Sequence, residues 1–186
     1  MDVEFRRTGD RRYGVAVLSP GRPTLEMNPA PGYDPFMPHD LIHFVVEREL
    51  RIRYGIFGQL AAGGTAGTFH PVAGASAPSR TATRQRRALA RRGATLLQKG
   101  RVDSAVSEQA ADLCHRAWLA RRADTPFAMK EGMPYSAMQI TRVCDVLDEL
   151  SAAWVTLSVG QALTLNWPVG DKERGIAAVR PTSRCR

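Results

Sequence analysis

The chain has 186 residues, with 26 Lys and Arg against 18 Asp and Glu, which gives a formal net charge of +8. This length predicts one domain or at most two, and it is sufficient to bury a core without disulfides or metal ions. Because 44% of the residues are hydrophobic and 24% are charged, the composition is that of a soluble globular protein. It excludes a mainly disordered or collagen-like chain.

The sequence also indicates a compartment. No stretch approaches the roughly 18 consecutive apolar residues of a membrane span, and residues 1–12 are too polar for a secretory signal. The three cysteines are an odd set without CxxC spacing, unlike a secreted disulfide framework. We therefore expect a cytoplasmic protein with no membrane association. Cys114 and Cys144 are predicted to be buried thiols, and Cys185 is predicted to be exposed.

The N-terminal part of the chain has the pattern of strands and turns. Apolar and polar residues alternate from Val3 to Met27, with turn signals at residues 8–11 and 19–23, which predicts three short strands. Residues 28–38 contain four prolines and a glycine. They predict an ordered loop, because proline is excluded from helix interiors and central strands.

The rest of the chain is mainly helical in pattern. Apolar residues at helical spacing predict helices over residues 38–55, 83–100, 103–122 and 136–157, with a second apolar piece at 56–62. Long loops are expected at 63–83 and 123–135, a strand at 161–168, and a mobile basic tail at 169–186.

These elements predict one α+β domain over residues 1–168. Strands at both ends of the chain suggest a small antiparallel sheet, in which the N-terminal hairpin strands are joined by a C-terminal strand. Three to four helices would pack on one face of this sheet.

The positive charge is concentrated in one segment. Residues 51–102 contain no Asp or Glu and ten basic residues, whereas the remainder has 16 basic and 18 acidic residues. On a helical projection Arg84, Arg87 and Arg91 form one stripe, and two leucines lie roughly opposite. Such a stripe can contact phosphates. The first hypothesis is a non-enzymatic interaction or regulatory protein that binds an acidic protein or nucleic acid through this face, without a cofactor.

A simpler interpretation of the basic segment stays open. The arginines could form a solvated face that pairs with acidic residues elsewhere, for example those at 145–149. No aromatic residue occurs between Arg80 and Arg101, so this segment contains no platform on which bases could stack.

A second hypothesis comes from the pattern His39-Asp40-x-x-His43-x3-Glu47. In a helix these histidines are one turn apart and can bind one metal ion, with Glu47 as a third ligand. The spacing is similar to the HExxH signature of zinc metallopeptidases, although Asp40 replaces the catalytic Glu. This hypothesis is a metal-dependent hydrolase, or an inactive relic of one, with zinc or a similar ion and Asp40 as the base.

The same cluster also has a purely structural interpretation. Asp40 is a normal first-turn residue, the two histidines can cap loop carbonyls, and Glu47 can pair with Arg51 at i+4. The sequence does not decide between the structural and the metal interpretation, and it does not indicate the oligomeric state.

Four segments add a resemblance: PHDLIHFVVE at 38–47, YGIFGQLAAG at 54–63, LDEL at 147–150 and WP at 167–168. Through them most of residues 1–168 resembles a family of small uncharacterised bacterial proteins with a PHDxxHFVVE helix motif. The resemblance implies an intracellular bacterial protein. It brings no activity, cofactor or catalytic residue.

Overall fold

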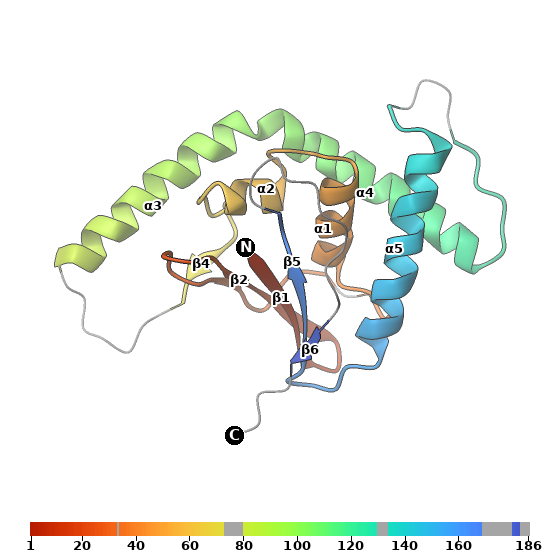
Figure 1. Ribbon diagram of the computed structural model, residues 1–186, viewed down its shortest axis with the longest axis horizontal. Helices are drawn as coiled ribbons and strands as arrows, with labels where there is room; N and C mark the ends of the chain where they lie inside the picture. The colour runs from red at the N-terminus through yellow and green to blue at the C-terminus, as the bar shows by residue number, and fades with distance from the viewer. Residues whose placement is uncertain (33, 73–79, 130–133, 169–179, 183–186) are drawn as a thin grey trace.

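A six-stranded antiparallel sheet forms one layer of the protein (Figure 1). The computed structural model describes residues 1–32, 34–72, 80–129, 134–168 and 180–182. The strands follow the order β4-β3-β2-β1-β5-β6 across the sheet. Their bounds are β1 (Asp2–Gly9), β2 (Arg12–Leu18), β3 (Leu25–Met27), β4 (His70–Pro71), β5 (Ala162–Asn166) and β6 (Arg180–Thr182).

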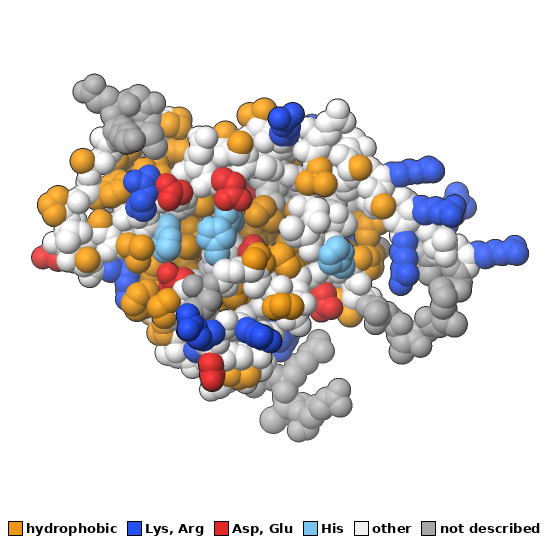
Figure 2. Space-filling model, turned by 180° about the vertical axis from the view of Figure 1, so that it is seen from behind, with side chains coloured by type: hydrophobic (Ala, Val, Ile, Leu, Met, Phe, Trp, Pro, Cys, Tyr) orange, Lys and Arg blue, Asp and Glu red, His pale blue; other side chains and the backbone are white. Residues whose placement is uncertain are grey.

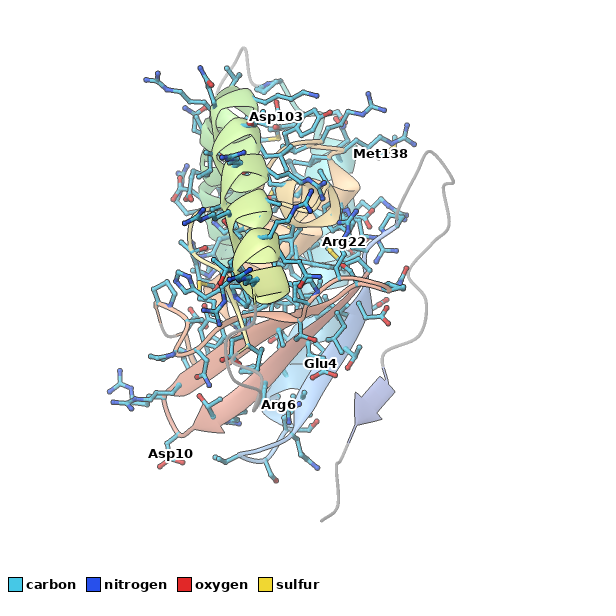
Figure 3. The ribbon with its side chains drawn as sticks, turned by 90° about the vertical axis from the view of Figure 1, so that its left-hand side faces the viewer. Glu4, Arg6, Asp10, Arg22, Asp103 and Met138 are labelled. Carbon is cyan, nitrogen blue, oxygen red and sulfur yellow. The ribbon has the colours of Figure 1, made fainter. Side chains whose placement is uncertain are left out.

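The helices lie on one face of this sheet (Figures 1 and 3). They are α1 (His39–Glu49), α2 (Ile56–Ala61), α3 (Arg80–Lys99), α4 (Arg101–Arg122) and α5 (Ala137–Val155). The alternation in β1 explains the layering, because successive side chains of a strand point to opposite faces. Phe5 is fully buried and packs edge-on against Phe44 of α1 at a centroid distance of 5.9 Å. Glu4 and Arg6 pair at 2.9 Å on the outer face (Figure 3).

This architecture confirms the predicted α+β class. β5 pairs with β1, with Val3 opposite Leu165, so the C-terminal strand joins the N-terminal hairpin as expected. The described part of the chain has five helices rather than three to four, because residues 56–61 form the separate short helix α2. The predicted helix 38–55 ends at Glu49. Arg51 then adopts a left-handed backbone conformation, with φ at 59°, which turns the chain towards α2.

Two predicted irregular segments contain short elements. Within the predicted loop 63–83, residues 70–71 form β4 and α3 begins at Arg80, while residues 73–79 lie outside the described part. In the predicted tail 169–186, Arg180–Thr182 forms β6 against β5, and the other residues, Cys185 included, lie outside the described part. Cys114 and Cys144 are buried and free, as predicted. In the described residues, we find no helix of the length and apolarity needed to span a membrane.

Candidate metal centre and basic helix

Helix α1 positions most of the polar residues of the candidate centre. It lies between the sheet and the helices α4 and α5, so residues 40–47 are all buried. Its first residue, His39, is exposed, whereas His43 one turn later is only 1% exposed. The two imidazoles therefore connect the surface with the interior.

A chain of hydrogen bonds, here called the polar chain, joins His43, Ser107 and Glu47. The Ser107 hydroxyl of α4 donates to Glu47 Oε1 at 2.8 Å, and Ser107 Oγ lies 2.9 Å from His43 Nδ1. All three residues are 1% exposed. Buried polar groups are costly unless they are hydrogen-bonded, and this arrangement supplies each of them with a partner.

The polar chain sets the tautomer of His43. The Ser107 hydroxyl has a single proton, and it donates this proton to Glu47 Oε1. Ser107 must then accept from His43, which places the imidazole proton on Nδ1. The other ring nitrogen, Nε2, keeps its lone pair. Burial, and then the charge of His39, lowers the pKa of His43 to about 4, so this imidazole is neutral near pH 7.

The lone pair of His43 Nε2 points to a place where two further ligand atoms converge. His39 Nε2 lies 3.1 Å from it, and Glu108 Oε2 of α4 lies 3.5 Å from it. Each of the three residues offers a ligand atom within 4.8 Å of the others. For comparison, two nitrogens that bind one tetrahedral zinc at about 2.0–2.1 Å are about 3.3 Å apart.

The surroundings of these three atoms suit an ion that keeps contact with solvent. His39 is exposed, and the side chain of Glu108 is 66% exposed. Histidine and acidic side chains gather on the face seen in Figure 2. Three protein ligands at an accessible edge leave a coordination position for water, which is the pattern of catalytic rather than structural zinc sites.

Glu47, the third ligand expected from the sequence, is not in this group of three. Its carboxylate instead caps α2, with Oε1 accepting from the Ile56 amide at 2.6 Å and Oε2 from the Phe57 amide at 2.9 Å. The fit is close, because a Cβ at Gly55 would lie 2.3 Å from the carboxylate. Burial raises the pKa of Glu47 to about 7, against the opposing effect of the hydrogen bonds from Ser107 and the two amides.

Asp40, the expected base, is also outside this group. It is 5% exposed, and its Oδ2 accepts from the Tyr13 hydroxyl of β2 at 2.6 Å. Burial raises the pKa of Asp40, and the hydrogen bond from Tyr13 opposes the shift. These contacts tie the start of α1 to the sheet.

Glu108, Ser107, Tyr13 and His115 are the site residues that the sequence analysis missed. His115 Nε2 lies 3.7 Å from Asp34 Oδ2, and this buried nitrogen has no hydrogen-bond partner among the described residues. Burial lowers the pKa of His115, and the nearby charges of Asp34 and His39 act in opposite directions. The one available signal was the seven-residue spacing of Glu108 and His115, which places both on one face of a helix.

The basic helix α3 is arranged differently. Arg84, Arg87 and Arg91 are all exposed. They form no ion pair within the described residues. Asp145 and Asp148, suggested above as partners for these arginines, instead pair with Arg121 of α4 at 2.6 and 3.4 Å.

The chain matches no protein-family model, no curated protein and no solved structure. The resemblance to small bacterial proteins and the cytoplasmic location therefore stay predictions.

Proposed function

We propose that the protein is a metal-dependent hydrolase whose ion, zinc by preference, binds to His39, His43 and Glu108. The observation behind this proposal is the convergence of His39 Nε2, His43 Nε2 and Glu108 Oε2, with separations of 3.1 and 3.5 Å from the His43 nitrogen. Two imidazoles and one carboxylate form a ligand set found in hydrolytic zinc sites.

The polar chain supports the proposal because it does what outer-shell groups do in metal sites. Metal-binding histidines usually donate their second N–H to a carboxylate, a carbonyl or water, which fixes the tautomer and the ring orientation. Here Ser107 accepts that proton from His43, at 2.9 Å, and is itself held by Glu47. The imidazole is therefore oriented before any ion binds.

The ligand types favour zinc over magnesium or calcium. Imidazole suits zinc, copper, iron and nickel, whereas magnesium and calcium prefer oxygen ligands. An ion with an open position supplies Lewis acidity and an activated water molecule, which is the chemistry of ester, amide and phosphate hydrolysis. Because two histidines and one carboxylate also bind Fe(II) in oxygenases, the metal analysis has to include iron.

The first experiment is elemental analysis of the purified protein, followed by calorimetric titration of zinc into chelator-treated protein. We expect about one zinc per chain in the wild type, and no stoichiometric zinc in His39→Ala or Glu108→Gln. His70→Ala is the matched control, because His70 is an exposed histidine of β4 outside the group of three. Equal zinc binding by the wild type and both ligand variants would contradict the proposed centre.

A second measurement separates the enzyme from a metal-binding protein without catalysis. The zinc-loaded and chelated forms are compared on a p-nitrophenyl ester, bis-p-nitrophenyl phosphate and a mixed peptide library. Hydrolysis that needs zinc and is lost in Glu108→Gln supports the hydrolase. A stoichiometric zinc protein that is inactive on all three probes would contradict it and leave only the metal centre.

A further inference from the structure

Helix α3 presents a regular row of arginines, here called the arginine stripe: Arg80, Arg84, Arg87 and Arg91. At 100° per residue these four positions fall within about 60° of one another on the helix surface. Their spacings along the helix axis are about 6, 4.5 and 6 Å, from a rise of 1.5 Å per residue. All four residues are exposed.

The opposite face of α3 packs against the body of the protein. Leu89 and Leu96 are half-buried, and Gly93 is buried between them. A Cβ at Gly93 would lie 3.0 Å from Thr65 Oγ1, so the helix approaches the 63–67 segment closely at this point. This contact turns the arginine stripe towards solvent. Figure 2 shows Lys and Arg side chains projecting from the end of the molecule that α3 forms in Figure 1.

Among the described residues, no acidic side chain compensates the charge of α3. Residues 80–99 contain six arginines, one lysine and no acidic residue. None of the arginines in this range forms an ion pair with another part of the described chain. A surface of this kind binds polyanions with the release of condensed counterions.

We propose that α3 binds the phosphate backbone of a duplex nucleic acid, largely independently of sequence. The guanidinium group binds phosphate through two parallel hydrogen bonds, which favours arginine over lysine in such contacts. A duplex presents its charges as a regular row, one phosphate per 3.4 Å of each strand. A helix about 10–12 Å in diameter also fits the major groove, which is about 12 Å wide.

Other polyanions fit α3 less well. A single strand needs aromatic side chains on which its bases stack, and none occurs between Arg80 and Arg101. An anionic membrane needs an amphipathic helix with a free apolar face. The leucines Leu89 and Leu96 face the body of the protein instead. An acidic protein segment is the remaining alternative, which polyglutamate represents in the experiment.

The experiment measures binding by fluorescence anisotropy over a range of salt concentrations. The probes are a 20-base-pair DNA duplex, one of its single strands, polyglutamate, and vesicles of phosphatidylserine and phosphatidylcholine. We expect the duplex to bind most tightly, with an affinity that decreases steeply as salt increases. In the triple variant Arg84→Gln, Arg87→Gln, Arg91→Gln, the slope of log K against log salt should become shallower by about 2.7, from about 0.9 per lost phosphate contact.

The control removes three arginines from other exposed positions, Arg12→Gln, Arg116→Gln and Arg142→Gln, of which Arg116 and Arg142 pair with Asp112 and Glu49. Its slope of log K against log salt should stay within about 0.9 of the wild-type slope, which is the contribution of one phosphate contact. If this slope became equally shallow in both triple variants, only net charge would matter, and the proposal would be overturned. Tighter binding to the single strand, polyglutamate or the vesicles, or no duplex binding at 50 mM salt, would overturn it as well. None of these outcomes depends on the metal centre.

Discussion

The polar chain between α1 and α4 and the arginine stripe of α3 differ in how their charges are compensated. In the polar chain the Glu47 carboxylate is 1% exposed and accepts hydrogen bonds from Ser107 and from two backbone amides. The arginine stripe is exposed and has no ion-pair partner in the described residues. The folding free energy therefore depends strongly on the first region, whereas the second should affect binding far more than stability.

The comparison also separates two routes to a binding site. A buried polar network can fix the direction of one lone pair, as it does for His43 Nε2, and the protein then has to tolerate the burial of a carboxylate. A solvated row of arginines needs no such network, because the arginines replace the condensed counterions of the polyanion, which are released. Substitutions in the two regions should therefore affect different measurements.

Gly55→Ala should have the largest effect on stability. A Cβ at this position would lie 2.3 Å from the Glu47 carboxylate, which cannot move without losing its bonds to Ile56 and Phe57. We expect unfolding in denaturant to show a loss of about 3 kcal/mol or more, as for other buried networks that are broken. Gly9→Ala is the control, because its nearest contact is at 3.6 Å on the flexible Arg12 side chain. Similar losses in both variants would show that the Glu47 contact is not the cause.

The titration of Glu47 should make stability depend on pH. Its pKa is about 7 in the folded protein against an ordinary value of 4.5, mainly because of burial. The folded state therefore binds more protons than the unfolded state in this range, so the free energy of unfolding decreases as pH rises from 4.5 to 7. At 1.36 kcal/mol per pKa unit, the decrease is about 3 kcal/mol.

Glu47→Gln isolates this contribution because glutamine does not titrate. Unfolding curves of both proteins are measured in EDTA at several pH values. They show how much more steeply the free energy of unfolding changes with pH in the wild type than in the variant. We expect the wild type to lose stability relative to the variant as pH rises, although the variant loses an acceptor for one of the buried donors. A relative gain of the wild type would show that the hydrogen bonds to the ionised carboxylate outweigh its burial.

Ser107→Ala should weaken the metal centre without removing a ligand. The hydroxyl is the acceptor that holds the Nδ1 proton of His43, so its loss frees the ring to rotate and to change tautomer. We expect zinc affinity to decrease by about 10- to 100-fold in calorimetric titration, the typical effect of outer-shell substitutions. Ser104→Ala, one turn earlier on α4, removes a hydroxyl that contacts Gln59 and should leave zinc affinity unchanged. A decrease in both variants would point to a general disturbance of α4.

The sequence predicted the two ligands of the candidate site that lie on one helix, His39 and His43. The i, i+4 spacing places His39 and His43 on one helix face, and the structure has their Nε2 atoms 3.1 Å apart. Glu108 comes from another helix, and no local period indicates which residue of α4 faces α1. Glu47 also has the right spacing from His43. Its side chain turns to the free amides of α2, because an unpaired helix N-terminus attracts a buried carboxylate.

The fold was predictable where the patterns are long. The alternation in β1 and β2 and the helical period of α5 extend over whole elements, and the capping box of Ser136 and Gln139 fixes the start of α5. β4 and β6 have two and three residues, and unlike the equally short β3 they do not continue an alternating pattern between turn signals. Their pairing depends on the sheet edges that the longer strands provide.

The smallest effect on stability is expected for the triple variant Arg84→Gln, Arg87→Gln, Arg91→Gln. These side chains are exposed and have no ion-pair partner in the described structure, so the fold loses no ion pair with them. The spacings i+3 and i+4 place like charges side by side, and each such pair destabilises a helix by about 0.2–0.5 kcal/mol. We therefore expect the variant to be more stable than the wild type by about 0.5 kcal/mol at low salt. The difference should disappear at high salt, where the repulsion is screened. A loss of more than about 1 kcal/mol would mean that the arginines stabilise the fold in the way the polar chain does, and the contrast between the two regions would not hold.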